Sequence, residues 1–329
     1  GDGHDGRAVG GRECTVQRRF KKLMEMAPSA RRPDALRAHI VDGGLTMARA
    51  VRYEGLGTFE FLADLQSADL PFVFIEANAR LQVEHTITEA VTGVDLVQAQ
   101  MALAAGQSLA DLGLDPARAP APRGYAIQWR INAETLDAQG GARPGSGTLS
   151  RFDLPTGPGV RVDTHGVAGG TPSPHYDTLL AKLIVHTRSA HFADALRRSQ
   201  RALAECRIDG VATNLNLLQA LAARPEMESQ QVHTRWLESV LSALLDTMKT
   251  VAYSADAASA GGQNGSQPPA PHAPAPEGAV LAPMPARLVL RAVADGDEVA
   301  AGTELAVLEA MKMEHVLLAP HAGRVRRLL

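Results

Sequence analysis

Two glutamates and an asparagine early in the chain are the residue types that bind a divalent cation. Apolar runs at residues 59–61 and 72–75 flank a polar stretch, and this pattern predicts a β-hairpin with a long loop. With the runs paired symmetrically, Glu60 lies opposite Glu76, and alternation puts Asn78 on the same face. Opposed carboxylates repel each other. A Mg²⁺ or Mn²⁺ ion held by these three oxygen donors relieves the repulsion, so we predict a metal site.

The other face of this hairpin is expected to meet a hydrophobic core. Alternation turns Phe59, Phe61 and Ile75 inward. If the chain stays extended beyond Asn78, three more polar residues join the metal-binding face. They are Arg80, Gln82 and Glu84. So many alternate polar residues after an apolar run favour an active-site floor over an ordinary hydrated strand face.

Lys312 stands between two methionines, inside short flanks that mirror each other about it. This setting resembles the acceptor site of biotin carrier domains, so we predict covalent biotin on Lys312 at the tip of a tight hairpin. The alternative interpretation is that Lys312 is an ordinary surface lysine, and that the two methionines beside it only fill gaps in a core. Residues 282–288 and 319–325 match in type, which indicates two halves of one small β domain.

Residues 254–278 form a segment rich in proline and alanine. Such a composition cannot bury enough apolar surface to fold, and it predicts a semi-extended tether. Random-coil scaling gives about 25 residues a typical reach of about 28 Å, enough to carry a small domain between neighbouring sites. We expect domains over residues 1–119, 120–253 and 279–329, with residues 254–278 as the linker.

Both ends of the sequence suggest a piece of a longer polypeptide. Residue 1 is not methionine, and the second copy of the repeat stops at Leu329, before equivalents of residues 293–308. We therefore expect the carboxyl-terminal β domain to be incomplete.

Composition narrows the class of protein. The chain has 329 residues, a net charge of −3 and 4% aromatic residues, which argues against nucleic-acid binding. The two cysteines, Cys14 and Cys206, indicate neither a disulfide framework nor a zinc site. The sequence contains no run of about 18 apolar residues, so it predicts no membrane-spanning helix. We expect a cytoplasmic location, with the mitochondrial matrix as the alternative for a eukaryotic protein.

Strands and helices alternate without a regular parallel βαβ pattern, so the predicted fold class is α+β. Helices are predicted over residues 32–51, with an interruption at Gly43-Gly44, and over residues 91–105, 192–206 and 236–248. Further strands are predicted over residues 125–131, 160–163 and 179–186.

Residues 59–62 and 74–85 strongly resemble the ATP-grasp core of biotin carboxylase. Residues 14–19 and 93–97 resemble neighbouring motifs of the same enzyme. Residues 130–134 and 176–184 are similar to the C-terminal domain of the same enzyme. The resemblance implies the C-terminal half of an ATP-grasp domain, the α+β C-terminal domain of biotin carboxylase, and a small all-β biotinyl domain of the hammerhead type.

In this family, ATP phosphorylates bicarbonate, and the resulting carboxyphosphate passes its carboxyl group to a ring nitrogen of biotin. The resemblance implies biotin on Lys312, ATP, and Mg²⁺ or Mn²⁺ as cofactors. It implies bicarbonate as a substrate, and biotin protein ligase and a carboxyltransferase domain or subunit as partners. The implied enzyme is a ligase, a homodimer when intact, which performs the first half-reaction of an acyl-CoA or pyruvate carboxylase.

The resemblance also assigns roles to single residues. The metal ligands are Glu60, Glu76 and Asn78, and the nucleotide contacts are Gln17, Phe20, Glu60, Leu62 and Glu76. The bicarbonate pocket consists of Lys22, Arg80, Gln82 and Val83. The catalytic residues are Arg80, Glu84 and Arg130. Glu84 resembles the general base, and Arg130 the cation that stabilises the enolate-like form of biotin.

The chain departs from the family pattern at Phe20, where many members have a nucleotide-contacting histidine. No glycine-rich phosphate loop precedes Gln17, so we expect the chain alone to lack ATPase activity. Asp177 and Lys182 are most simply explained by a buried structural hydrogen bond beside Tyr176. Two other functions stay open. One is an ATP-grasp ligase of another substrate class, and the other is a non-enzymatic biotin carrier with a scaffold.

Overall fold

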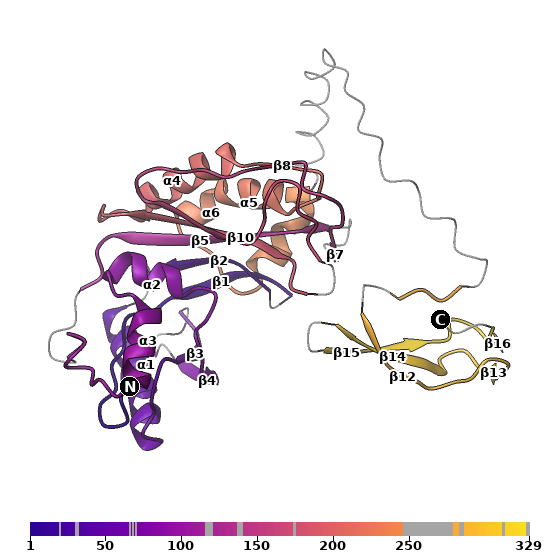
Figure 1. Cartoon of the computed structure of the whole chain (residues 1–329), viewed down its shortest axis with the longest axis horizontal. Helices are drawn as coiled ribbons and strands as arrows, with labels where there is room; N and C mark the ends of the chain where they lie inside the picture. The colour runs from indigo at the N-terminus through magenta and orange to yellow at the C-terminus, as the bar shows by residue number, and fades with distance from the viewer. Residues whose placement is uncertain are drawn as a thin grey trace, which may run out of the picture.

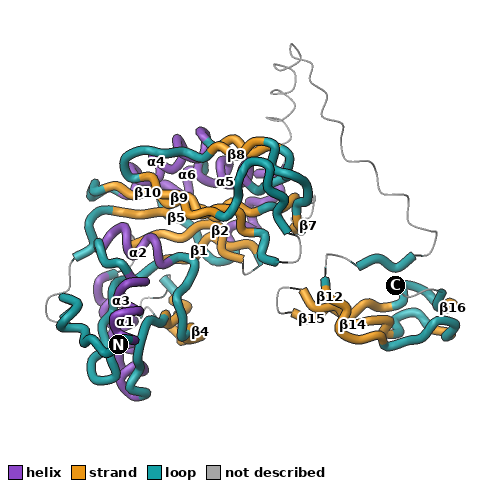
Figure 2. Tube along the Cα trace, in the orientation of Figure 1, coloured by secondary structure: helices purple, strands orange, loops and turns teal. Residues whose placement is uncertain are grey.

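The structure is a computed structural model. It describes residues 1–19, 21–29, 33–65, 67, 69, 71–115, 121–136, 141–173, 176–245, 279–282, 286–310 and 313–326. Helices and mostly antiparallel strands are mixed, which confirms the predicted α+β fold class (Figures 1 and 2). No helix in these described ranges is both long and apolar enough to cross a membrane.

A five-stranded antiparallel sheet, in the order β1-β2-β5-β10-β9, lies at the centre of the larger part of the chain. Its strands are β1 (Glu13–Arg18), β2 (Lys21–Ala27), β5 (Tyr125–Asn132), β9 (Val160–Thr164) and β10 (Leu179–Thr187). The three predicted strands in this region are confirmed. Strands β1 and β2 are not predicted, because neither shows a regular alternation: the buried positions of β1 are irregular, and the last five residues of β2 are all buried.

Helices cover one face of this sheet (Figure 1). They are α4 (Phe192–Glu205), α5 (Leu215–Ala222), α6 (Pro225–Glu228) and residues 236–245. Trp129 and Leu183 of the sheet share the main hydrophobic core with Leu203 and Leu218 of the helices, and all four are fully buried. The predicted helix over residues 192–206 is confirmed. The one predicted over 236–248 is observed to residue 245, after which the described residues stop.

The opposite face of the sheet carries the polar side chains. Because Trp129 of β5 points toward the helices, alternation turns Gln128 and Arg130 to the other side. Helix α2 (His85–Thr92) packs on that side, where Ile87 contributes to a second, smaller core. This arrangement brings the N-terminus of α2 close to the polar residues of β5.

Residues 91–105 do not form the single helix that we predict. Helix α2 ends at Thr92, and a second helix, α3 (Leu96–Ala104), follows it. Gly93, with a φ of 76°, caps the end of α2 in the left-handed conformation. Asp95 then accepts a hydrogen bond from the backbone N–H of Gln98, so it caps the start of α3.

Helix α1 (Asp34–Ala50) packs against a hairpin whose strands are β3 (Thr58–Ala63) and β4 (Phe72–Asn78). The expected interruption at Gly43-Gly44 is wrong, because the helix continues through both glycines. A Cβ added to Gly44 would lie 3.9 Å from Phe59 and Phe61. Packing against these rings outweighs the low helix propensity of glycine.

Four short strands complete the larger part of the chain. They pair as β6 (Glu134–Leu136) with β7 (Ala142–Pro144), and β8 (Arg151–Asp153) with β11 (Arg207–Asp209).

The described carboxyl-terminal elements are all β, as predicted. A three-stranded sheet contains β12 (Arg287–Arg291), β14 (Glu304–Ala310) and β15 (Met313–Leu318), while β13 (Glu298–Val299) pairs with β16 (Gly323–Arg324). Strand β12 begins at Arg287, and β16 contains Arg324, the matching residue of the second copy. The sequence repeat therefore corresponds to a repeated strand.

Candidate active site

The predicted pairing of the two glutamates is confirmed. In the hairpin of β3 and β4, Thr58 pairs with Asn78, and Glu60 pairs with Glu76. The two carboxylates are therefore neighbours on one face of the hairpin, where like charges destabilise the pair unless a cation lies between them.

Beyond Glu60 a register shift changes the other face of the hairpin. Phe61 pairs with Phe74, so Ile75 has no partner position in β3. The expectation that Ile75 faces the core is wrong, since this residue is 56% exposed. Phe74 takes its place and contacts the rings of Phe59 and Phe61.

Lys22 connects this hairpin to the central sheet. Its Nζ lies 2.9 Å from Oε1 of Glu60 and 2.9 Å from Oε1 of Glu84. Burial alone lowers the pKa of Lys22, but Cys14, Glu84 and Glu60 outweigh it, so this pKa lies above its usual value. Lys22 is therefore charged at neutral pH.

Glu84 is buried at the N-terminus of α2, with only 3% of its surface exposed. Its Oε1 accepts from Lys22, and its Oε2 accepts from Arg130 at 3.1 Å. Burial raises the pKa of this carboxyl, but Lys22, Arg12 and Arg130 lower it by more, so the pKa lies below its usual value. Glu84 is thus ionised at neutral pH, as a proton acceptor must be.

Arg130 has a second carboxylate partner, Glu25, which is fully buried in β2. Nε of Arg130 donates to Oε1 of Glu25 at 2.6 Å, and Nη2 contacts the same carboxylate. Gln128 donates to the other oxygen of Glu25 at 3.0 Å and is held in turn by Thr86. Burial raises the pKa of Glu25, and the charge of Arg130 opposes this shift. Two carboxylates therefore fix the plane of the guanidinium.

Gln82 is held from two sides and is 8% exposed. Its Nε2 donates to Oε1 of Glu60 at 3.1 Å, and its Oε1 accepts from Nη2 of Arg12 at 3.2 Å. The expectation that an extended strand carries Gln82 and Glu84 is wrong, because β4 ends at Asn78. Both side chains reach the cluster from the turn before α2 instead.

Asn78 and Arg80 lie at the edge of the cluster. Nδ2 of Asn78 donates to Oε1 of Glu76 at 2.7 Å, and Oδ1 of Asn78 accepts from Arg80 at 3.4 Å. Arg80 is exposed and also donates to the carbonyl of Leu81. No contact in the described part of the chain joins Arg80 to Lys22, so the structure does not bring Arg80 into the pocket that the resemblance implies.

The two glutamates fit a hard divalent cation. Hydrogen bonds with described residues engage only Oε1 of Glu60 and Oε1 of Glu76, which leaves Oε2 of each available. Asn78 turns its amide nitrogen toward Glu76, so its oxygen would have to rotate toward an ion bound there. Within the described ranges, no group of three His, Cys, Asp or Glu side chains is placed to hold a metal. The predicted site consists of two carboxylates and one amide.

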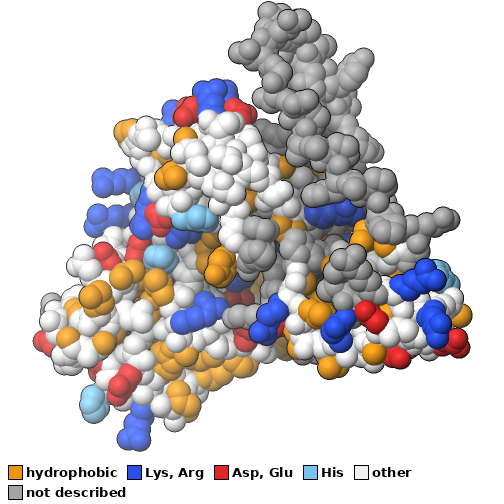
Figure 3. Space-filling model, turned by 45° about the vertical axis from the view of Figure 1, so that its right-hand side comes forward, with side chains coloured by type: hydrophobic (Ala, Val, Ile, Leu, Met, Phe, Trp, Pro, Cys, Tyr) orange, Lys and Arg blue, Asp and Glu red, His pale blue; other side chains and the backbone are white. Residues whose placement is uncertain are grey.

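The predicted nucleotide contacts come from two hairpins. Gln17 pairs with Lys22 across β1 and β2, and Leu62 of β3 is 49% exposed. Phe20 lies outside the described residues. Exposed large hydrophobic residues of β4 accompany Leu62, namely Val73, Phe74 and Ile75. In Figure 3, which shows one face of the molecule, hydrophobic side chains lie in several groups among the charged ones.

Lys182 of β10 lies next to the turn that carries Val83. Its Nζ donates to the carbonyl of Val83 at 3.3 Å and pairs with Asp163 at 2.9 Å. Asp177 is exposed and accepts a backbone hydrogen bond. The expected buried contact beside Tyr176 is wrong, since Tyr176 is 80% exposed. Lys182 instead links β9 to the turn that carries Val83.

The structure describes the strands on either side of the predicted biotin attachment point. Strands β14 and β15 pair so that Ala310 lies opposite Met313. These strands therefore end on either side of residues 311 and 312. Lys312 itself lies outside the described residues.

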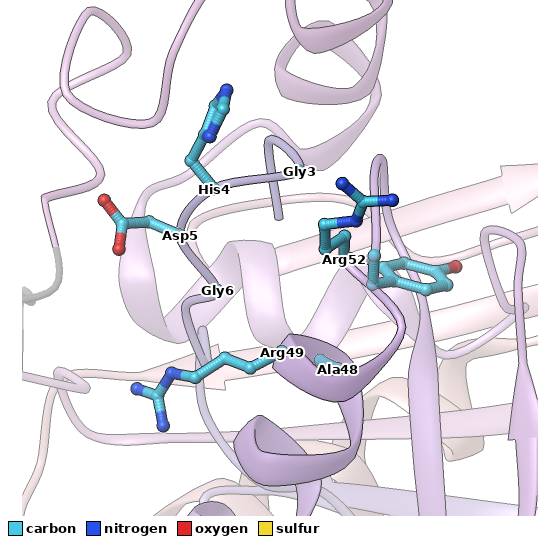
Figure 4. Close-up of a pocket in the computed structure, with 8 residues that line it drawn as sticks. Gly3, His4, Asp5, Gly6, Ala48, Arg49 and Arg52 are labelled. Carbon is cyan, nitrogen blue, oxygen red and sulfur yellow. The ribbon is translucent and has the colours of Figure 1, made fainter.

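A small pocket lies away from this cluster, between the amino-terminal residues and the end of α1 (Figure 4). It has room for about one water molecule. Its lining residues are Gly3, His4, Asp5, Gly6, Ala48, Arg49, Arg52 and Tyr53. None of the predicted site residues lines it, so we assign it no role.

Three family models match the chain in succession. Residues 2–112 match the carbamoyl-phosphate synthase L chain ATP-binding domain, and residues 128–239 match the biotin carboxylase C-terminal domain. Residues 278–329 match the biotin-requiring enzyme domain.

Two relatives are similar to much of the chain. The chain is 36% identical to the biotin-dependent acyl-coenzyme A carboxylase alpha3 subunit of Mycobacterium leprae, over 96% of this chain and 58% of that protein. It is 42% identical to pyruvate carboxylase 1 of Caenorhabditis elegans, over 69% of this chain and 19% of that protein. The chain thus spans just over half the length of the first relative and a smaller part of the second.

Solved structures show the same fold. The biotin carboxylase domain of a single-chain bacterial carboxylase matches with a TM-score of 0.70 and 46% identity, over 76% of this chain and 56% of that one. The biotin carboxylase domain of Hydrogenobacter thermophilus 2-oxoglutarate carboxylase, a dimer in complex with MgADP and bicarbonate, matches with a TM-score of 0.65 and 36% identity. That match covers 72% of this chain and 50% of the other.

Together, the structure and these matches define a biotin carboxylase fold of the ATP-grasp type joined to a biotin/lipoyl domain. The chain belongs to the biotin carboxylase family, with the C-terminal and ATP-binding domains of that enzyme followed by a biotin-requiring domain.

Proposed function

We propose that the intact protein is a biotin-dependent carboxylase that carboxylates biotin on Lys312 with ATP and bicarbonate, and that this chain contributes the charged cluster of that active site and the biotin-bearing lysine. The strongest support is that one hydrogen-bonded cluster of charged and polar side chains occurs in a chain that also matches a biotin-requiring domain. The cluster joins Lys22, Glu60, Gln82, Glu84 and Arg130.

The donors of this cluster suit a bicarbonate ion. Lys22 supplies a positive charge, and Gln82 supplies an amide N–H. The backbone N–H of Val83 has no hydrogen bond with the described residues and supplies a third donor. Glu84 is the ionised acceptor for the bicarbonate proton. Arg80 is proposed as a further contact that enters the pocket from its exposed position.

Glu60, Glu76 and Asn78 are the proposed ligands of Mg²⁺ or Mn²⁺. A bound ion would neutralise phosphate charge and orient the nucleotide, which phosphoryl transfer requires. Gln17, Phe20 and Leu62, together with Glu60 and Glu76, are the proposed contacts to ATP. The presence of MgADP and bicarbonate in the related 2-oxoglutarate carboxylase domain supports this assignment.

Arg130 is proposed to stabilise negative charge on the ureido oxygen of biotin. Its guanidinium is a planar donor whose orientation is fixed by Glu25 and Glu84, so it needs little reorganisation when charge develops. This position also places the cation next to the proposed base.

For the acceptor of the carboxyl group, we propose an acyl-CoA. Support comes from the Mycobacterium leprae acyl-CoA carboxylase subunit, which aligns over 96% of the chain and thus through the carrier domain. The pyruvate carboxylase from Caenorhabditis elegans aligns over 69%. A carboxyltransferase, a biotin protein ligase and a second copy of the intact protein are the proposed partners, and the cytoplasm is the proposed location.

A test is bicarbonate-dependent ATP hydrolysis by the intact protein, measured with and without free biotin. We expect free biotin to stimulate turnover and Glu76→Gln to lower it. Unchanged turnover in Glu76→Gln would refute the metal assignment. ATP turnover that requires another acceptor in place of bicarbonate would favour an ATP-grasp ligase of another class, and the absence of any ATP turnover would favour a non-enzymatic carrier.

A further inference from the structure

We propose that Arg12 is a positioning residue for bicarbonate, because it fixes which end of the Gln82 amide faces the active site. This inference rests on the proposed function and assigns a role to a residue outside the reacting centre.

Arg12 lies just before β1 and contacts three segments of the chain. Its Nη2 donates to Oε1 of Gln82 at 3.2 Å and to Oγ1 of Thr58 at 2.8 Å. Its Nη1 donates to Oγ1 of Thr88 at 3.1 Å. Thr58 belongs to β3, the partner strand of β4, and Thr88 belongs to α2, so the guanidinium is anchored both to the β3–β4 hairpin and to the helix that follows the turn of Gln82.

The chemistry of the guanidinium allows only one orientation of the amide. An arginine has donors and no acceptor, so the Gln82 atom beside it must be the oxygen. The NH₂ group then points to the other side, where Oε1 of Glu60 accepts from it at 3.1 Å. A reversed amide would place two donors face to face at Arg12 and two acceptors face to face at Glu60.

This orientation matters for an anionic substrate. A bicarbonate oxygen next to Gln82 is attracted by an N–H donor and repelled by a carbonyl oxygen. Glu60 favours the same orientation, but Oε1 of Glu60 is shared with Lys22, and Glu60 is a proposed metal ligand. Arg12 holds the amide independently of whatever binds to Glu60.

The test compares variants of the intact protein by steady-state kinetics of bicarbonate-dependent ATP hydrolysis. Arg12→Met should raise the KM for bicarbonate by about tenfold, the loss expected for one charge-assisted hydrogen bond. The KM for ATP should stay within about twofold of the wild-type value, since Arg12 contacts no proposed nucleotide residue. Arg12→Lys keeps a donor for Gln82 and should give a smaller rise in the KM for bicarbonate.

The matched control is Thr58→Val, which removes one anchor of Arg12 and leaves its contact with Gln82. We expect its KM for bicarbonate to match that of the wild type. In a Gln82→Met background, Arg12→Met should cause no further rise, because the two residues act through one contact.

Three results would overturn the inference. They are an unchanged KM for bicarbonate in Arg12→Met, an equal rise in the KM for ATP, and the same rise in the Gln82→Met background. If thermal unfolding shows that Arg12→Met does not fold, the same comparisons are made with Arg12→Lys. If the wild type shows no bicarbonate-dependent turnover, the proposed function fails. If turnover is normal but does not respond to substitution of Arg12, only the inference about Arg12 fails.

Discussion

The guanidinium of Arg130 donates a 3.1 Å hydrogen bond to Oε2 of Glu84, so the proposed biotin-stabilising cation touches the proposed base. Lys22 donates to the other oxygen of this carboxylate at 2.9 Å. A cation on each oxygen keeps Glu84 ionised despite its burial. The contact places the proposed proton acceptor between the proposed bicarbonate donors and the arginine that is proposed to meet biotin.

Replacing Glu84 by glutamine should remove the proton acceptor while keeping its shape. We expect the rate of bicarbonate-dependent ATP hydrolysis to fall by about 100-fold or more, the range of a positioned general base. The measurement is turnover of the intact protein at saturating ATP and bicarbonate. A glutamine variant with a rate near that of the wild type would exclude Glu84 as the base.

The same substitution should reveal a pH-dependent contribution to stability. The pKa of Glu84 lies below its ordinary value of 4.5, so its ionised form stabilises the fold above that pH. This stabilisation is lost as the pH falls through the folded-state pKa. The difference in unfolding free energy between wild type and Glu84→Gln should therefore be largest near neutral pH and shrink in acid. Denaturant unfolding at several pH values measures it, and a difference independent of pH would contradict the assignment.

Arg130 should matter for stability as well as for catalysis. Arg130→Met leaves the fully buried carboxylate of Glu25 without its cation, and we expect a loss of about 3 kcal/mol in unfolding free energy. Adding Glu25→Gln should recover part of that loss. The control is Arg151→Met, which breaks an exposed pair with Asp153 and should change stability little. Equal effects of the two arginine variants would argue against a buried ion pair.

The opposed glutamates predict a defined response to metal. Glu76→Gln should weaken Mn²⁺ binding in the presence of ATP by roughly tenfold or more, a loss seen even for outer-shell partners of metal sites. Because the substitution also removes the repulsion between the opposed carboxylates, the metal-free protein should unfold at the same temperature as the wild type or slightly above it. Calorimetric titration measures the affinity, with Glu205→Gln on α4 as the control. Wild-type Mn²⁺ affinity in Glu76→Gln would remove Glu76 from the metal site.

The register of the β3–β4 hairpin could be predicted because it is a local property. Glu60 and Glu76 follow the alternation of apolar and polar residues on each side of one loop, and the structure pairs them as expected. The shift that exposes Ile75 could not be predicted this way. A bulge inserts one residue without changing the composition of the strand, and only the packing of Phe74 against Phe59 shows where it occurs.

The partners that hold the site are separated from it by long stretches of sequence. Arg12 contacts Gln82 across 70 residues, and Glu25 contacts Arg130 across 105. No local periodicity reports such contacts. One signal was present in β2, where Glu25 is a lone acidic residue between Met24 and Met26. A charge in an apolar strand requires a buried partner of opposite charge.

Helix boundaries also depend on contacts that the local sequence pattern does not reveal. Gly43-Gly44 has low helix propensity, yet α1 continues through it because the hairpin packs against that side of the helix. Gly93 ends α2, where the predicted helix was expected to continue. The two outcomes differ in tertiary packing and backbone conformation, which the residue type alone does not determine.

The most direct test of the whole account follows a carboxyl group onto the carrier domain. The biotinylated intact protein is incubated with ATP, Mg²⁺ and isotope-labelled bicarbonate, and the label is located by mass spectrometry of the peptide that contains Lys312. We predict an acid-labile carboxyl group on the biotin of Lys312 that requires ATP and is absent from Glu84→Gln. Biotin on Lys312 that never acquires the label, or acquires it equally without ATP, would contradict the account.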